Sequence, residues 1–470
     1  MTRNRWPSIS DGCGQARRVK GIQFLRTQIV HPGADNLRYE IRQIVEVARA
    51  IETTGAAIRW ENIGDPVAKG ERVPDWIKEI VTQAAGEDLS FAYSPTKGLD
   101  ETRAYIAHER NLEGGIQITP DDILFFNGLG DAISTIYGAL HPKARVIGPN
   151  PAYPTHSSAE AAHAGAPHIT YRLDPENGWK PDLADLEAKV IGNPDIAAII
   201  IINPDNPTGF VYPEETLAAI VDIAARHDLF IISDEIYSNL AYLGSGMRKL
   251  ASVVGKVPAI AMRGISKEFP WPGSRCGWIE IYNRDQDQNF DRFARSLLEA
   301  KMLEVCATTL PQKVLPRVMG DERYYPYLET RVSAYDRRAQ RAVEVLGGLP
   351  ELIIHPARGA FYMTAVFREG ALALDQSLPM APQVEAIIGP YLGDALDARF
   401  VYHLLGNTGI CVVPLSTGFN SDLEGFRFTL LEPDEQKFEA ILQHLRGALA
   451  AYLASGAQAR PLGVELAAAG

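Results

Sequence analysis

Ile-Ala-Ala-Ile-Ile-Ile-Ile-Asn-Pro-Asp-Asn-Pro-Thr-Gly occupies residues 196–209, and Leu-Phe-Ile-Ile-Ser-Asp-Glu-Ile-Tyr occupies residues 229–237. Each stretch begins as a continuous apolar run, as strands do when helices cover both faces of their sheet. Between them, residues 214–227 place Leu217, Ile220, Val221 and Ala224 at helical spacing, with Pro213 directly before the run. A strand, a helix and a strand in series predict right-handed crossovers and a mostly parallel sheet.

The same alternation of short apolar runs and amphipathic stretches continues on either side. We expect further strands at residues 123–126, 144–147 and 259–265, and we assign residues 75–325 to a large α/β domain. Residues 326–455 read as a smaller α/β domain, with helices at 331–346 and 438–453 and strands at 359–366, 410–413 and 425–431.

The ends of the chain carry weaker patterns. Residues 1–35 are interpreted as an N-terminal extension and residues 36–74, with a helix at 39–54, as a segment that joins the smaller domain. Residues 370–400 are interpreted as a surface elaboration, and residues 456–470 as a flexible tail.

Composition narrows the class of protein. The 470 residues are 46% hydrophobic with a net charge of −12, which is ordinary for a soluble globular protein and argues against non-specific binding of nucleic acid. No apolar run is long enough to span a membrane, and no secretory signal is visible. The four cysteines form no CxxC pair, so we expect reduced thiols and a cytoplasmic protein.

Three histidines invite a metal interpretation. Their spacing fits no usual ligand pattern, so we expect no metal site and interpret them as surface or loop residues; they are His156, His163 and His168.

Polar residues follow three of the predicted strands. Asn206, Asp234 and Lys267 come directly after apolar runs, and the carboxyl ends of parallel strands share one edge of a sheet. Open α/β sheets bind ligands along that edge. Residues about thirty positions apart in the sequence are therefore expected to meet in one pocket.

These residue types suit pyridoxal 5'-phosphate, which needs an amine for its aldehyde, a carboxylate for its ring nitrogen and donors for its phenolic oxygen. Lys267 would supply the amine and move the Cα proton, Asp234 would hold the nitrogen protonated, and Asn206 and Tyr237 would reach the phenolic oxygen. The plain alternatives are a surface lysine, a helix N-cap and a turn-forming asparagine.

The phosphate is expected on Gly128-Leu129-Gly130, where a helix over residues 131–140 begins and backbone N–H groups favour an anion. Ser266 and Arg275 would complete that site, and Tyr153 would stack on the ring. A simple tight turn, a surface ion pair and a core tyrosine are the alternatives. Arg427, between two phenylalanines on a predicted strand, is either an edge residue or a clamp for a carboxylate.

Taken in order, NPDNPTG at 203–209, SDEIY at 233–237, Ser-Lys at 266–267 and PGSRCGW at 272–278 resemble the motifs of the class I/II aminotransferase family. The resemblance covers about residues 36–453 and implies a fold-type I pyridoxal-phosphate enzyme. Within that family, residues 36–42, Tyr93 in YSPTKG and Gly-Ile-Ser-Lys are most similar to the alanine aminotransferase branch.

The resemblance assigns covalent cofactor attachment to Lys267, the ring nitrogen to Asp234 and the phenolic oxygen to Asn206 and Tyr237. It assigns the phosphate to Ser266, Arg275 and the backbone of Leu129 and Gly130. It also implies that Tyr93 reaches the phosphate of a neighbouring subunit in an obligate homodimer. The α-carboxylate clamp falls to Arg427, with Gly64 on the same side of the substrate. Tyr39 and Arg42 are further substrate candidates, Arg42 for a distal carboxylate or as a plain surface arginine.

Two departures from the family pattern concern the phosphate. Gly264 stands where many relatives carry a serine, and the turn Gly-Leu-Gly-Asp lacks the usual hydroxyl.

We expect a homodimeric aminotransferase that runs a ping-pong cycle, with alanine and 2-oxoglutarate as the favoured pair and no nucleic-acid or membrane partner. A pyridoxal-phosphate-dependent β-eliminase (C–S lyase) or decarboxylase would use the same cofactor residues. An aminotransferase-like regulatory sensor would need a DNA-binding module of about 60–70 residues, and only about 35 precede the predicted fold.

Overall fold

The computed structural model describes residues 30, 33–34 and 41–456, and its largest sheet has eight strands. Their spatial order is β2 (Ile123–Phe126), β9 (Gly277–Tyr282), β8 (Ala259–Gly264), β7 (Phe230–Asp234), β6 (Ile196–Ile202), β3 (Arg145–Asn150), β4 (Thr170–Asp174) and β5 (Lys180–Pro181). The run from β8 to β4 is parallel, whereas β9 and β5 pair antiparallel with their neighbours. The mostly parallel sheet is confirmed.

Both faces of this sheet are covered by helices, which explains the continuous apolar strands. On β6, Ile199 and Ile201 join the core shared with α7 (Glu214–Arg226). Ile200 joins the opposite core, which also holds residues of α4 (Leu129–Ala139) and α8 (Gln288–Glu304). Each fully buried isoleucine contributes about 1.5–3 kcal/mol to the free energy of folding. A strand in which polar and apolar residues alternate would therefore be unstable here.

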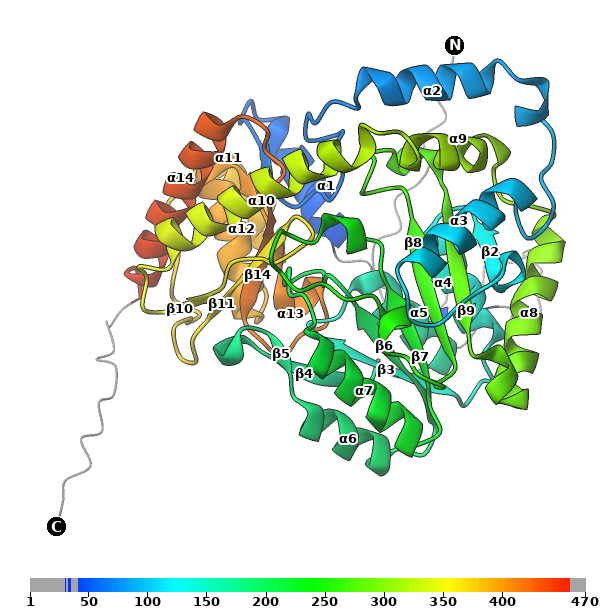
Figure 1. Cartoon of the computed structure of the whole chain (residues 1–470). Coiled ribbons are helices and arrows are strands. Elements are labelled where there is room, and N and C mark those ends of the chain that lie inside the picture. Colours follow the sequence, from blue (N-terminus) through cyan, green and yellow to red (C-terminus); the bar gives the residue numbers. More distant parts are fainter. Residues whose placement is uncertain (1–29, 31–32, 35–40, 457–470) are drawn as a thin grey trace, which may run out of the picture.

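Further helices complete this part of the molecule. The helices α2 (Asp75–Ala85) and α3 (Asp100–Leu112) both pack on α9 (Thr309–Met319). The helix α5 (Pro154–Ala164) packs on α4, and α6 (Leu183–Gly192) packs on β4. Figure 1 shows this part beside a smaller one, with α10 (Tyr324–Leu346) running from one to the other.

The smaller part is built on a four-stranded antiparallel sheet. Its order is β10 (Leu352–Ile354), β11 (Tyr362–Phe367), β14 (Gly425–Thr429) and β13 (Val413–Pro414). The helices α12 (Leu396–Thr408) and α14 (Glu435–Leu453) pack together beside it. A parallel pair of β1 (Arg59–Trp60) and β12 (Ile410–Cys411) connects the N-terminal segment to this part. The domain limits stay predictions, although α10 crosses the proposed boundary at 325/326.

Several local predictions are wrong. Residues 410–413 form two short strands in different sheets, β12 and β13, because the chain changes partner at Val412. The helix predicted at 331–346 begins earlier, at Tyr324, and the one predicted at 131–140 begins at Leu129.

The stretch 370–400 is not a surface elaboration. Leu372, Leu378, Val384 and Ile388 are buried in the main core. The helix α11 (Pro382–Ile388) within it packs on α12 and on α1 (Ile41–Glu52). Removing the stretch would therefore expose core surface of the smaller part.

Tyr39, most of residues 1–35 and residues 457–470 lie outside the described residues, so predictions about them are not addressed by the structure. Within the described ranges, every helix is too short or too polar to cross a membrane.

Candidate active site

A cavity of about 270 Å³ lies beyond the carboxyl ends of β6, β7 and β8. Nine of the residues predicted from the sequence line it: Leu129, Gly130, Tyr153, Asn206, Asp234, Tyr237, Ser266, Lys267 and Arg275. These residues come from six separate segments of the chain. The parallel strands bring them together because each polar residue follows its strand at the same sheet edge.

Asp234 ends β7 and is buried. Its Oδ1 accepts a hydrogen bond from the Ile236 backbone at 3.1 Å, which closes a tight turn after the strand. Its Oδ2 lies 3.1 Å from Nε2 of His156 on α5. The carboxylate is thereby held on a fixed side of the cavity.

The interpretation of the histidines as surface or loop residues is wrong for His156, which lies in α5, whereas His168 lies in the loop that follows this helix. The His156 side chain is buried against Asp234, and the His168 side chain is buried against Glu160 at 3.1 Å. Pro154 at the first position of α5 was the available signal, since it places residues 155 and 156 in the first turn of a helix. Among the described residues, no cluster of three or more His, Cys, Asp or Glu side chains is arranged to hold a metal ion.

Asn206 and Arg427 form the link between the two sheets. Asn206 Oδ1 accepts from Nη1 of Arg427 at 3.1 Å, and Nη2 of Arg427 donates to the Asn62 carbonyl oxygen at 2.7 Å. The guanidinium carbon lies 4.3 Å from the ring centre of Tyr362 and 5.0 Å from that of Phe419. Arg427 is only 3% exposed, and β14 is an interior strand, so it is not an edge residue.

Tyr362 is a residue of this region that the sequence analysis missed. Its hydroxyl accepts a hydrogen bond from the Tyr237 hydroxyl at 3.3 Å. Burial holds the pKa of the Tyr237 hydroxyl well above its ordinary value, so this phenol stays protonated and able to donate. A Cβ at Gly64 would lie 1.9 Å from the Tyr362 hydroxyl, so only glycine fits beside it.

Lys267 lies between these groups. Its Nζ donates to the Gly64 carbonyl oxygen at 2.6 Å and lies 5.8 Å from the ring centre of Phe361. The side chain is half-buried, in the loop that follows β8. The lysine amine therefore reaches both the cavity and the segment that contains Gly64.

The end of the cavity at α4 is suited to an anion. The helix begins at Leu129 directly after Gly128, whose φ of 83° is left-handed, and its first backbone N–H groups have no acceptors within the helix. Arg275 Nη2 donates to the Asn127 carbonyl oxygen at 3.4 Å, across Gly128. A Cβ at residue 128 would lie 2.3 Å from that nitrogen, so the glycine lets the guanidinium lie on the turn.

Hydroxyl groups along the cavity come from Ser266 and from Thr155, which the sequence analysis did not name. The departure at Gly264 has a steric reason. A Cβ there would lie 2.9 Å from the Cys276 carbonyl oxygen on the neighbouring chain segment, which leaves no room for a serine.

Four other predicted residues do not line the cavity, and one of them is Arg427, which adjoins it through its bond to Asn206. Tyr93 is 84% exposed at the surface, and Arg42 is exposed on α1. Gly64 adjoins the cavity only through Lys267.

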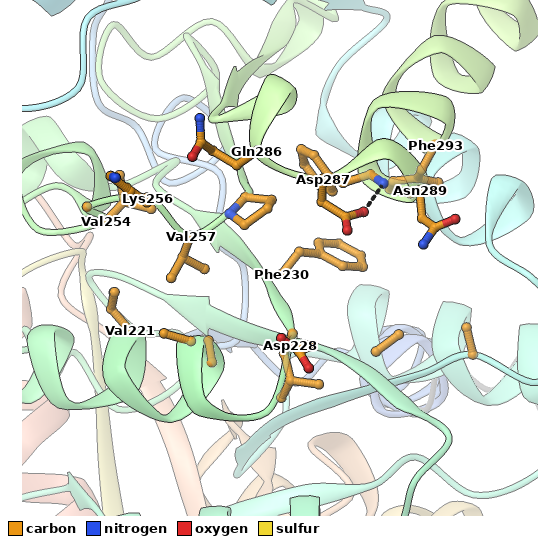
Figure 2. A pocket seen from close by; sticks show the side chains of 18 of the residues that line it. Val221, Asp228, Phe230, Val254, Lys256, Val257, Gln286, Asp287, Asn289 and Phe293 are labelled. Carbon is orange, nitrogen blue, oxygen red and sulfur yellow. Dashed lines mark hydrogen bonds between the residues drawn. The ribbon is translucent and has the colours of Figure 1, made fainter.

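A larger hollow of about 1210 Å³ lies at the opposite edge of the sheet, among Val221, Phe230, Val257 and Phe293 (Figure 2). It contains none of the predicted site residues. Asp287, one of its acids, accepts from the Phe290 backbone at 2.7 Å and so caps α8. The smaller cavity is therefore the candidate active site.

Asp205, in the loop after β6, gives the fold a pH dependence. It is fully buried; Oδ2 accepts from the backbone and hydroxyl of Thr208, whereas Oδ1 has no partner among the described residues. Burial raises the pKa of this carboxyl from 3.8 to about 7. The folded state thus binds the proton more tightly than the unfolded state, and its stability falls as the pH rises from 3.8 through about 7.

Asp205→Asn keeps an acceptor for Thr208 and removes the charge. We expect the variant to be more stable than the natural chain above pH 7 by up to about 4 kcal/mol, an advantage that shrinks to nothing towards pH 4. Thermal melting of both chains from pH 4 to pH 8 measures this difference. An advantage that is constant with pH would show that Asp205 is ionised throughout.

The groups around the small cavity fit pyridoxal 5'-phosphate. A helix N-terminus and Arg275 could hold an anion, two hydroxyls line the same cavity, the buried Asp234 carboxylate could pair with a ring nitrogen, and a lysine amine lies within reach of both. The tyrosine and asparagine donors complete the set that this cofactor needs.

Comparisons with known proteins agree with the assignment of this cofactor. The family described as Aminotransferase class I and II matches residues 62–445. An uncharacterized aminotransferase of Methanocaldococcus jannaschii is 53% identical over 423 residues, which is 90% of this chain and 98% of that protein. The glutamate-pyruvate aminotransferase AlaA of Escherichia coli is 29% identical over 70% of this chain and 80% of its own length.

Among solved structures, the alanine aminotransferase from Pyrococcus furiosus superimposes with a TM-score of 0.77 at 27% identity, over 90% of this chain and all of that one. The fold is that of the fold-type I pyridoxal-phosphate enzymes. With the family pattern matched across both sheets, the chain belongs to the class I and II aminotransferases and is a pyridoxal-phosphate-dependent enzyme.

Proposed function

We propose that this aminotransferase moves an amino group from an L-amino acid to a 2-oxo acid by a ping-pong cycle, with alanine and 2-oxoglutarate as the favoured pair. The observation that carries the proposal is the meeting of Lys267, Asp234 and Asn206 in one cavity, with Arg427 bonded to Asn206 at 3.1 Å. The names of the E. coli and P. furiosus relatives support alanine as the donor.

The bound cofactor supplies an aldehyde for the substrate amine and a ring that accepts electrons when the Cα proton leaves. Asp234, oriented by His156, would keep the ring nitrogen protonated, and Asn206 and Tyr237 would donate to the phenolic oxygen. Lys267 Nζ would hold the cofactor covalently and, as a free amine, would take and return the Cα proton of the substrate.

Arg427 would bind the substrate α-carboxylate. Its guanidinium is fixed by Asn206 and the Asn62 carbonyl and lies against two aromatic rings, so little conformational entropy is lost on binding. A charge-assisted, bidentate contact from a buried guanidinium sets the direction of the Cα–H bond towards Lys267. A distal carboxylate, as in 2-oxoglutarate, needs a further cation, for which Arg42 stays our candidate.

Incubation with L-alanine and 2-oxoglutarate tests the reaction. We expect pyruvate and glutamate in equal amounts, and parallel lines in double-reciprocal plots when both substrates are varied, since the donor product leaves before the acceptor binds. Ammonia release without glutamate would show that the enzyme catalyses elimination and not transamination. Activity with other donors but none with alanine would show that the proposed donor is wrong and that the proposed reaction, transamination, is right.

We also propose a homodimer in which Tyr93 reaches the phosphate of the partner's cofactor. Tyr93 lies on an exposed segment with Leu89 and Phe91, and this segment is tied to the start of α9 by a 2.7 Å hydrogen bond from Thr309 Oγ1 to the Ala92 carbonyl. Leu303, at 90% exposure near the end of α8, adds a further large apolar side chain to the surface. Apolar exposure of this kind is typical of interfaces.

Sedimentation equilibrium tests the assembly, since a dimer has twice the 51.5 kDa mass of the chain. A fully active species with the mass of a single chain would exclude a shared active site.

A further inference from the structure

Lys301, on the last turn of α8, is a buried cation that the reaction above does not use. Its side chain is 1% exposed, and Nζ lies 4.9 Å from the ring centre of Phe126, at the end of β2. Nζ donates to Asp131 Oδ2 at 3.0 Å and to Glu304. A single buried ammonium therefore pairs with two carboxylates.

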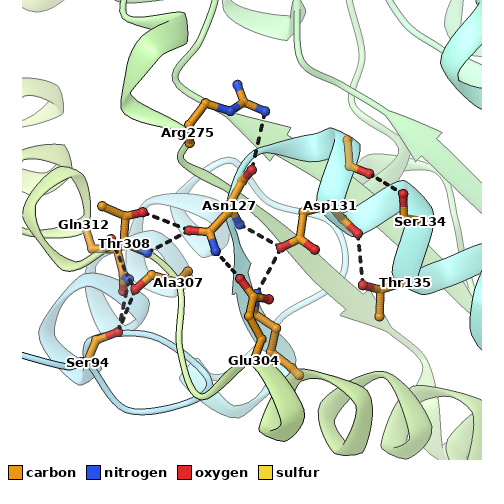
Figure 3. A network of polar contacts seen from close by, with 12 residues as sticks. Ser94, Asn127, Asp131, Ser134, Thr135, Arg275, Glu304, Ala307, Thr308 and Gln312 are labelled. Carbon is orange, nitrogen blue, oxygen red and sulfur yellow. Dashed lines mark hydrogen bonds and ion pairs between the residues drawn. The ribbon is translucent and has the colours of Figure 1, made fainter. Parts of the chain in front are cut away.

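These carboxylates lie directly behind the turn proposed to hold the phosphate. Asp131 Oδ2 also accepts from the Asn127 backbone N–H at 2.9 Å, and the Asn127 side chain donates to Glu304. Asn127 Oδ1 accepts from both the backbone and the hydroxyl of Thr308 at 2.9 Å, and Arg275 donates to the Asn127 carbonyl. Figure 3 shows this network, centred on Asn127.

The position of Asp131 creates an electrostatic conflict. It stands in the first turn of α4, where a carboxylate and a bound anion are attracted by the same backbone N–H groups and helix dipole. With Lys301 in place, the Asp131 carboxylate is turned back towards Asn127 and α8, and the N–H groups of Leu129 and Gly130 stay available at the cavity. Without it, two carboxylates of like charge would face an incoming phosphate.

We propose that Lys301 is a positioning residue for the cofactor phosphate: it neutralises Asp131 and Glu304 and fixes the turn at Asn127 and Gly128 in its anion-binding form. The inference rests on the proposed phosphate site at Leu129, Gly130 and Arg275. It concerns the phosphate alone, because the network contacts neither Lys267 nor Asp234.

The test is a titration of the full chain, freed of cofactor, with pyridoxal 5'-phosphate and separately with pyridoxal, which lacks the phosphate. For Lys301→Met we expect the Kd for pyridoxal 5'-phosphate to rise at least about tenfold. The Kd for pyridoxal should stay within about twofold of the natural chain. Lys301→Arg, which keeps the charge, and the double variant Lys301→Met with Asp131→Asn should both regain most of the lost affinity.

Lys313→Met is the matched control, because Lys313 is also a buried lysine paired with a carboxylate, Glu87 at 3.0 Å, but lies on α9 away from the turn. It should leave both Kd values unchanged. An unchanged Kd for pyridoxal 5'-phosphate in Lys301→Met would overturn the inference. An equal loss for both ligands would overturn it too, since the role would then not be tied to phosphate. If the natural chain bound both ligands equally well, that result would instead contradict the proposed phosphate site itself.

Discussion

Lys267→Ala is expected to lower kcat/KM for amino transfer by at least about 10⁴-fold, because one side chain both holds the cofactor covalently and moves the Cα proton. The fold should survive, since the Lys267 side chain is half-buried and, within the described residues, its polar contact is one hydrogen bond to the Gly64 carbonyl. Turnover of alanine measures the loss of catalysis. The visible absorbance of the protein with pyridoxal 5'-phosphate measures the loss of covalent attachment.

Lys256→Ala is the natural control for this experiment. Lys256 is exposed and precedes the same strand, β8, at the opposite edge of the sheet. It should keep both the absorbance and the turnover of the natural chain. If Lys267→Ala kept the visible absorbance of the natural chain with pyridoxal 5'-phosphate and its full turnover, another amine would be the attachment site and our assignment would be wrong.

Arg427→Ala is expected to produce the second largest effect. Loss of a buried, charge-assisted partner for a carboxylate costs about 2–5 kcal/mol, or roughly 30-fold to several-thousand-fold in kcat/KM for the amino donor. Arg427→Lys should recover only part of this, because an ammonium cannot contact a carboxylate, Asn206 and the Asn62 carbonyl with one planar group. The affinity for pyridoxal 5'-phosphate should change little in either variant.

Arg338→Ala separates the loss of binding from the loss of structure. Arg338 is likewise buried in the smaller part and donates to the Leu430 carbonyl at 3.0 Å, but it pairs with Glu435 and does not reach the cavity. It should lower the melting temperature without raising the donor KM. An unchanged donor KM in Arg427→Ala would place the carboxylate clamp elsewhere.

The sequence predicted those parts of the fold in which local pattern and tertiary environment agree. The strand over residues 196–202 was predictable because helices cover both faces of the sheet, so its residues are continuously apolar. The helix that begins at Glu214 was predictable because one of its faces is buried, which spaces its apolar residues at the helical period. Asn206, Asp234 and Lys267 were predictable as neighbours because each comes directly after such a strand.

Other features depend on contacts that no local pattern encodes. Tyr362 and His156 matter because folding places them against Tyr237 and Asp234, residues 125 and 78 positions away. The early start of α10 was hidden by Pro326, which a first helical turn tolerates. In residues 370–400 the buried apolar residues are separated by prolines and glycines, so they show no helical or strand period.

The position of Arg427 has a consequence for how this enzyme can be redesigned. The groups proposed to hold the vitamin come from segments that follow strands of the eight-stranded sheet, whereas the guanidinium proposed to bind the substrate comes from β14 of the four-stranded one. We therefore expect exchanges on β11 and β14 to alter donor preference and leave coenzyme retention intact, except at Tyr362 and Arg427, which bond to Tyr237 and Asn206. Asn206 and Tyr237 should be left unchanged, because each lines the cavity and also bonds to a residue of the four-stranded sheet.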